Sequence, residues 1–138
     1  MKLSALYQIF LDCQSVTTDS RNCPDGSLFI ALKGESFNGN AFAKLALDSG
    51  CAFAIIDEIQ YAVEGDQRYI LVDDCLQTMQ QLANYHRRQL GTRVIGITGT
   101  NGKTTTKELI SSVLCQAHNV LYTLGNLNNH IGVPLTLL

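Results

Sequence analysis

The sequence lacks two features that would assign it to a familiar class of protein. It has no apolar run approaching the roughly 18 residues that cross a membrane, and its amphipathic first residues lack a signal peptide's continuous apolar segment. It also has no excess of one charge: a net charge of −2 over 138 residues gives no electrostatic basis for binding nucleic acid. We therefore expect no membrane insertion and no nucleic-acid partner.

Paired cysteines are missing too. The five cysteines are an odd number, and no two of them stand in a C-x-x-C spacing, which argues against a disulfide scaffold and against a zinc knuckle. We expect them to be free thiols in a reducing cytoplasm, so the expected location is cytoplasmic. His86, His118 and His130 are too far apart for metal-ligand spacing, so we expect structural or surface roles for them.

What the chain does contain is enough apolar residue to bury a core. Hydrophobic residues make up 46% of the sequence and charged residues 16%, a composition typical of a globular protein. The length allows one ordinary domain or two small ones.

The chain is organised around residues 96–106, GITGTNGKTTT. A short apolar run at 94–97 precedes this stretch as a buried strand would, and apolar residues at helical spacing follow it. In that context the glycines let backbone N–H groups approach a polyphosphate, and the helix N-terminus adds its partial positive charge. Lys103 can reach the β- and γ-phosphates, and the Thr104 hydroxyl is placed for Mg²⁺. The stretch predicts a nucleoside triphosphate site.

The match to the general phosphate-loop pattern G-x-x-x-x-G-K-[ST] is not complete. Ile97 stands where that pattern has its first glycine, and the glycines here are Gly96, Gly99 and Gly102. The alternative is a glycine-rich turn before an ordinary helix. The strand before the loop and the amphipathic helix after it favour the phosphate site.

The sequence pattern of residues 1–91 predicts a small α/β unit. Short apolar segments rich in β-branched residues alternate with segments at helical spacing. We expect strands near residues 16–18, 28–32, 51–56 and 69–72, and helices near 3–13, 41–49 and 76–90. Asp73 or Asp74 is the expected cap of the last helix and Gly91 its end, while residues 33–40 are expected to form a polar loop.

A second unit begins after a junction at residues 91–93. It contains the strand, the phosphate loop, the helix and a further strand expected at 120–123. One strand–helix–strand unit cannot close a doubly wound sheet, which needs several more such units. We therefore expect an α/β domain at 1–91, followed at 92–138 by the truncated start of a P-loop ATPase domain. The 138 residues would be the front part of a longer enzyme.

Three motifs together resemble the Mur ligases of peptidoglycan synthesis. They are TDSR at 18–21 followed by GSLFIALKG at 26–34, TGTNGKTT at 98–105, and GNLNNHIGVP at 125–134. The first resembles the family's uridine-nucleotide-binding domain and the second its ATP loop. The third is similar to a loop of the branch that adds D-alanyl-D-alanine. One departure is Asn38-Gly39-Asn40, where the family often has Asp-Gly-His.

The resemblance implies an ATP- and Mg²⁺-dependent ligase with a UDP-sugar domain, an ATPase domain and a domain for the incoming amino compound. It would join D-alanyl-D-alanine to UDP-N-acetylmuramoyl tripeptide (UDP-MurNAc-tripeptide) through an acyl phosphate. This chain would contain the first domain and the opening of the second, would be monomeric and would be inactive by itself. Lys103 and Thr104 would be catalytic, with Thr104 on Mg²⁺. The nucleotide would be bound by Gly99, Thr100, Asn101, Gly102, Lys103, Thr104 and Thr105.

The resemblance also assigns residues to the UDP-sugar. They are Thr18, Ser20, Glu35, Ser36, Phe37, Asn126, Asn128 and Asn129. Each group has a structural alternative: residues 18–21 can be a turn held by Asx-type hydrogen bonds, Phe37 can pack against the core, and the asparagines can simply form turns.

Other functions stay open. The chain could come from the sibling Mur ligase that adds the third stem residue, or from a folylpolyglutamate synthetase; the asparagine-rich loop argues against the first and the N-terminal domain against the second. From another class, it could be a nucleotide-sugar-binding module without turnover.

Overall fold

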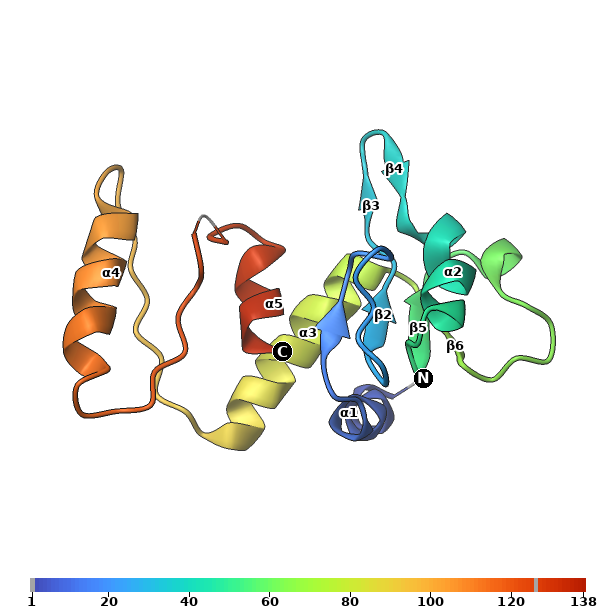
Figure 1. The fold of residues 1–138 in the computed structure, drawn as a ribbon, viewed down its shortest axis with the longest axis horizontal. Helices are drawn as coiled ribbons and strands as arrows, with labels where there is room; N and C mark the ends of the chain where they lie inside the picture. Colours follow the sequence, from blue (N-terminus) through green and yellow to red (C-terminus); the bar gives the residue numbers. More distant parts are fainter. Residues whose placement is uncertain (1, 126) are drawn as a thin grey trace.

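Four short parallel strands form the sheet of the N-terminal part in this computed structural model, which describes residues 2–125 and 127–138. The strands are β1 (Val16–Thr17), β2 (Leu28–Ile30), β5 (Phe53–Ile56) and β6 (Tyr69–Leu71), in the spatial order β1-β2-β5-β6. Leu28 pairs with Val16 on one side and with Phe53 on the other, and Ala54 pairs with Tyr69. Because all four strands are parallel, the loops that follow them leave from the same edge of the sheet (Figure 1).

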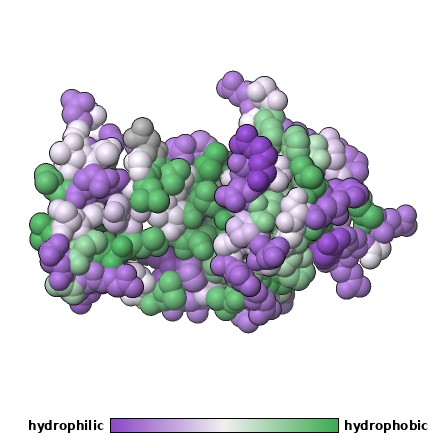
Figure 2. All heavy atoms as spheres, in the orientation of Figure 1, coloured by the Kyte–Doolittle hydropathy of each residue, from purple (hydrophilic) through white to green (hydrophobic). Residues whose placement is uncertain are grey.

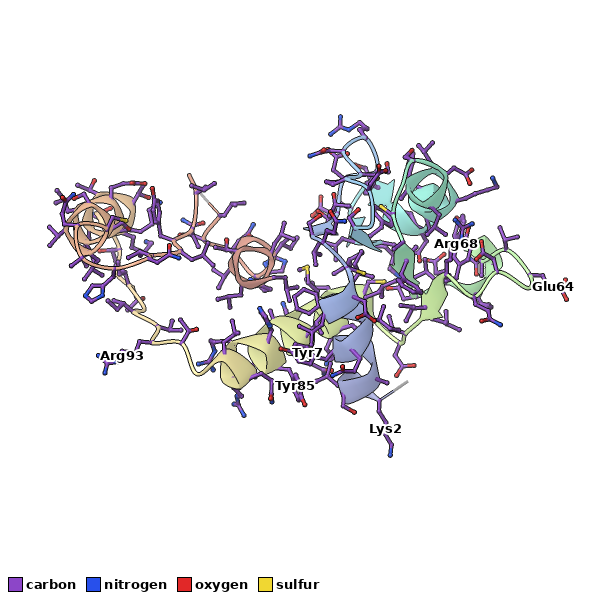
Figure 3. All side chains as sticks on the ribbon, turned by 60° about the horizontal axis from the view of Figure 1, so that its bottom comes forward. Lys2, Tyr7, Glu64, Arg68, Tyr85 and Arg93 are labelled. Atoms are coloured by element: carbon purple, nitrogen blue, oxygen red, sulfur yellow. The ribbon has the colours of Figure 1, made fainter. Side chains whose placement is uncertain are left out.

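Helices cover both faces of this sheet. They are α1 (Leu3–Asp12), α2 (Ala43–Asp48) and α3 (Cys75–Leu90). Figure 3 shows α1 and α3 together on one side of the strands and α2 on the other. The rings of Tyr7 in α1 and Tyr85 in α3 meet edge to face with centroids 4.9 Å apart, and the Tyr7 hydroxyl lies 3.1 Å from Nδ1 of His86. The N-terminal part is therefore a layered α/β unit, as its alternating pattern predicted.

The core lies between these layers. Its largest fully buried apolar side chains are Leu28, Phe29, Ile30, Ile55, Ile56, Met79 and Leu82. The strand residues among them are buried on both faces of the sheet, which is why they form continuous apolar runs in the sequence. Helix α3 starts and ends as predicted: the Asp74 carboxylate accepts a hydrogen bond from the Gln77 N–H at 2.7 Å, and Gly91 ends the helix with φ +61°.

Two elements were not anticipated. The predicted polar loop contains an antiparallel hairpin, β3 (Lys33–Gly34) and β4 (Phe37–Asn38), followed by a 3₁₀ turn at Gly39–Phe42. Another 3₁₀ turn occurs at Ile59–Tyr61. The other unanticipated element is a short helix, α5 (Gly132–Leu137), that packs against α3. The hairpin and α5 are both stabilised by tertiary contacts, so the local apolar pattern does not indicate either of them.

The C-terminal part carries α4 (Lys103–Leu114), which confirms the helix predicted after the phosphate loop. The strands predicted at 94–97 and 120–123 are wrong: across residues 2–125 and 127–138, neither segment enters a β-ladder. A strand needs a hydrogen-bonded neighbour, and these segments have none. Apolar side chains consequently stay exposed there and in α4, and Figure 2 shows apolar surface over this part of the molecule; they include Val94, Ile95, Leu109, Val113, Leu121 and Leu124.

No helix in the described part of the chain combines the length and apolar character needed to cross a membrane. The division into units at residues 91 and 92 stays a prediction.

Candidate functional site

The phosphate loop turns into α4 through two glycines with positive φ. Gly99 has φ +148° and Gly102, the residue before the helix, has φ +77°, conformations that side-chain-bearing residues rarely adopt. Since Gly102 has no side chain, no side-chain cap occupies the free N–H groups of the first helical turn. That turn also has no acidic residue, so the positive end of the helix is left for an anion.

A hollow of about 290 Å³ lies over this turn. It is lined by Thr100, Asn101, Gly102, Lys103, Thr104, Thr105 and Asn128. Six of the seven residues predicted to bind the nucleotide therefore surround one space. The seventh, Gly99, accepts a 2.6 Å hydrogen bond from the Lys103 ammonium through its carbonyl oxygen. The lysine amine thus lies over the loop it belongs to, within reach of an anion in the hollow.

Two residues of the asparagine-rich loop, Asn128 and Asn129, make different contacts. Asn128 lines the phosphate hollow, whereas the Asn129 carboxamide oxygen accepts hydrogen bonds from the N–H groups of Ile131 and Gly132, at 3.1 and 2.7 Å. Asn129 thus closes an Asx-type turn just before α5, as the turn alternative anticipated. Asn126, also predicted to bind substrate, lies outside the described residues.

Lys107 links α4 to the segment that leads into this loop. Its ammonium donates a 2.6 Å hydrogen bond to the carbonyl oxygen of Thr123, lies 2.8 Å from a carboxylate oxygen of Glu108 and stands over the Tyr122 ring. This contact holds the chain between residues 120 and 124 against the helix that follows the phosphate loop.

The other predicted UDP-sugar residues lie away from this hollow, at the carboxyl edge of the parallel sheet. Thr18 and Ser20 follow β1 in a turn organised by Asp19, whose carboxylate accepts hydrogen bonds from the backbone N–H of Arg21 at 3.0 Å and from its guanidinium at 2.9 and 2.8 Å. These hydrogen bonds lower the pKa of the exposed Asp19 to about 2. The Asx-type turn is therefore present, and it presents Thr18 and Ser20 on a fixed loop.

Glu35, Ser36 and Phe37 occupy the far end of the β3–β4 hairpin, which projects beyond the sheet (Figure 1). Phe37 does not pack against the core: its side chain is 48% exposed and stacks on the ring of Phe42 with centroids 5.2 Å apart. In the described residues, no hydrogen bond joins this group to the phosphate loop. The structure thus has two separate candidate sites.

Sequence reasoning missed a buried polar cluster at the base of the hairpin. The Asp57 carboxylate, 5% exposed, lies 3.0 Å from the Lys33 ammonium and accepts a 2.8 Å hydrogen bond from the Asn40 carboxamide and one of 3.2 Å from the Cys75 N–H. Burial pushes the pKa of Asp57 upward, but the hydrogen bonds from Asn40, Lys33 and Cys75 outweigh it and leave that pKa below its ordinary value. Burial, reinforced by the Asp57 charge, raises the pKa of the Cys75 thiol to about 12. The available signal was an Asp-Glu pair directly after an apolar strand.

Among the described residues, no cluster of three or more histidine, cysteine, aspartate or glutamate side chains could hold a metal ion. Thr104 lines the phosphate hollow, and a threonine at this position of a phosphate loop is the residue type whose hydroxyl binds Mg²⁺.

Two family models match this chain. The model of the Mur ligase family, catalytic domain, matches residues 12–87, and that of the Mur ligase middle domain matches residues 97–138. UDP-N-acetylmuramoyl-tripeptide--D-alanyl-D-alanine ligase of Bacillus subtilis is 49% identical over 123 residues, or 89% of this chain; the Escherichia coli protein of the same name is 42% identical over 90% of it. In both cases the chain spans 27% of the relative's length.

Solved structures of MurF ligases are also similar to this chain. MurF from Acinetobacter baumannii superposes with a TM-score of 0.83 and 34% identity, covering 99% of this chain and 32% of that one. The MurF ligase from Thermotoga maritima, solved in complex with ADP, gives a TM-score of 0.81 and 31% identity over 93% of this chain and 29% of its own.

Proposed function

The chain belongs to the Mur ligase family, and from that premise we propose that it supplies the nucleotide-sugar unit and the phosphate loop of an ATP-dependent ligase. The reaction we propose joins D-alanyl-D-alanine to UDP-MurNAc-tripeptide, as the names of its relatives state for those proteins. Because the chain spans 27% of those relatives, the activity is assigned to the longer protein that contains it. For residues 1–138 alone we expect binding without turnover.

The observation that carries this proposal is the hollow over α4. Its lining combines the N-terminus of a helix, the lysine Lys103 and three threonines, a donor set suited to phosphates. Asn128 enters the same hollow from a loop far along the chain, so the site is assembled by the fold as well as by one local motif.

The proposed reaction has two steps. A carboxylate oxygen of the tripeptide attacks the γ-phosphorus of ATP, ADP leaves, and an acyl phosphate forms. The amine of D-alanyl-D-alanine then attacks the acyl carbon, inorganic phosphate leaves, the amine loses a proton and an amide bond forms. Phosphoryl transfer depends on positioning and charge neutralisation more than on covalent chemistry by the protein. Lys103 and the backbone from Gly99 to Thr105 would hold the phosphates in line for attack.

Thr104 would provide a hydroxyl ligand for Mg²⁺, because it lines the hollow beside Lys103. The metal, when bound, would neutralise negative charge on the phosphate oxygens. Thr18, Ser20, Glu35, Ser36 and Phe37, at the carboxyl edge of the sheet, would contact the UDP-sugar, as ligands of parallel sheets generally bind at that edge.

The test uses the longer protein and its Lys103→Met variant. We expect phosphate release that requires UDP-MurNAc-tripeptide, D-alanyl-D-alanine and ATP together, and a loss of at least about hundredfold in kcat on removing the ammonium, the size typical of losing one charge-stabilising group. Lys44→Met is the matched control, since Lys44 is exposed on α2 and pairs with Asp48 on the same helix. Wild-type protein that binds UDP-MurNAc-tripeptide yet never releases phosphate would favour the nucleotide-sugar-binding module instead.

A further inference from the structure

The base of the β3–β4 hairpin is fixed by more bonds than a two-pair ladder provides. The two strands pair only at Lys33 with Asn38 and at Gly34 with Phe37. An isolated hairpin of this size is not stable in water, so its orientation has to be set by what lies beneath it. Glu35 and Ser36 lie at its far end, with Phe37 beside them.

Asp57 connects that base to the sheet and to a helix. It follows β5 directly, and one carboxylate oxygen, Oδ1, contacts both Lys33 of β3 and Asn40 of the turn after β4. The other oxygen, Oδ2, accepts the hydrogen bond from the N–H of Cys75, the first residue of α3. One buried carboxylate thus joins both ends of the hairpin to the sheet and to the start of α3.

A second hydrogen bond joins the same two residues, with Asp57 as the donor and Asn40 as the acceptor. The Asn40 side chain is almost fully buried, at 1% exposure, and its carboxamide oxygen accepts a 3.0 Å hydrogen bond from the Asp57 N–H. Its Nδ2 group also donates to the Asn38 carboxamide oxygen at 2.9 Å. Asn40 and Asp57 therefore form a reciprocal pair, in which each side chain satisfies a group on the other residue and neither has freedom to rotate.

We propose that Asp57, paired with Asn40, is the positioning residue that holds the β3–β4 hairpin where its far end meets the nucleotide-sugar substrate. The inference rests on the proposed function, because it takes Glu35, Ser36 and Phe37 as substrate contacts. Asp57 itself touches no substrate in this scheme. It acts through the hairpin, so its removal weakens binding of one substrate and leaves the phosphate loop unchanged.

The variant Asp57→Asn tests this with little change in volume. A carboxamide has one acceptor oxygen, so it cannot accept from Asn40 and Lys33 on one oxygen while accepting from the Cys75 N–H on the other. In the longer protein, we expect about a tenfold rise in the KM for UDP-MurNAc-tripeptide, because a displaced contact costs binding of the group it touches. The KM for ATP should stay within about twofold of wild type, since the hollow over α4 shares no residue with this cluster.

Asp48→Asn is the matched control. It also removes a carboxylate that pairs with a lysine in the same domain, at 2.7 Å from Lys44, but on the exposed surface of α2. Both KM values should equal those of wild type. Hydrogen–deuterium exchange gives a second measurement: Asp57→Asn should speed exchange of the amides in residues 33–40, while those of β2 and β5 keep their protection.

The outcomes separate the inference from the function. If wild-type protein shows no substrate-dependent phosphate release, the proposed function fails and this inference fails with it. If wild type is active and Asp57→Asn leaves the KM for UDP-MurNAc-tripeptide unchanged, only the inference is overturned. A parallel rise in both KM values, or faster exchange throughout the sheet, would show a purely structural role and would also overturn it. A rise confined to the nucleotide-sugar, with exchange faster only in the hairpin, supports it.

Discussion

Gly39 is the residue where one added methyl group should do most damage to the hairpin. A Cβ atom built there would lie 2.5 Å from the carbonyl oxygen of Leu32 and 2.9 Å from the backbone carbonyl carbon of Ala31 and the nitrogen of Leu32. These neighbours are backbone atoms, so no side-chain rotation relieves the overlap. The Gly39 N–H also donates a 2.9 Å hydrogen bond to the same Leu32 oxygen, and moving apart to make room breaks it.

The cost of Gly39→Ala follows from these two effects. Overpacking of a buried site costs about 1–3 kcal/mol, and the lost hydrogen bond adds about 1 kcal/mol. Alanine makes the unfolded chain stiffer, which returns roughly 0.4–1 kcal/mol. We therefore expect Gly39→Ala to lower the free energy of unfolding by about 1–3.5 kcal/mol.

Urea unfolding of the chain, followed by far-ultraviolet circular dichroism, measures this difference as a lower midpoint at an unchanged m-value. Gly34→Ala is the control from the same hairpin. A Cβ there meets nothing within 4 Å, so its unfolding free energy should equal that of wild type or exceed it by about 0.5 kcal/mol. Equal stability of the two variants would show that the hairpin does not sit against residues 31–32 as described.

Two further predictions concern charge and packing. The pKa of Asp57 is lower in the folded chain than the value of about 3.9 expected for an unfolded chain. The stabilising effect of the Asp57 carboxylate is therefore fully present above about pH 4, and it is lost as the pH falls through the folded-state pKa. The gap in unfolding free energy between wild type and Asp57→Asn should thus stay constant above about pH 5 and narrow as the pH falls below about 4; a gap that stays constant below about pH 4 in urea titrations would contradict this. Leu82→Ala, at a fully buried position of α3, should cost about 2–5 kcal/mol. Leu90→Ala, in the same helix but 61% exposed, should cost under about 0.5 kcal/mol, and similar losses in thermal unfolding would refute the assigned packing.

The elements that sequence reasoning located are those whose signal is local. Helix α3 has an apolar stripe, an aspartate cap and a terminal glycine, and β2 and β5 are continuous apolar runs because both of their faces are buried. The phosphate loop was found in the same way, since its glycines, lysine and helix are adjacent in the sequence. Six of its seven predicted residues line one hollow, although their role with a nucleotide stays a prediction.

What could not be predicted depends on partners distant in the sequence. The β3–β4 hairpin is polar and has a ladder of two residue pairs, and it is ordered by Asp57, 17 residues beyond Asn40. The segments at 94–97 and 120–123 show the converse: their composition favours strands, yet in the described chain no neighbouring strand completes them. In both cases the deciding contact lies outside the window in which a pattern is visible.

The two candidate sites, although separate, lie in parts of the chain that are connected through α5, a helix of 6 residues. Helix α5 packs on α3 of the N-terminal unit, and the Gln80 carboxamide of α3 donates a 3.0 Å hydrogen bond to the carbonyl oxygen of His130, just before α5. A glycine at position 132 allows the chain to pass this close to Leu127, because a Cβ atom there would lie 2.7 Å from the Cα atom of Leu127. The loop that begins α5 therefore has one end fixed to the unit proposed to bind the UDP-sugar, while its Asn128 lines the phosphate hollow. In the proposed reaction the tripeptide carboxylate has to meet the γ-phosphate of ATP, and this loop links α3 of the N-terminal part to the hollow over α4.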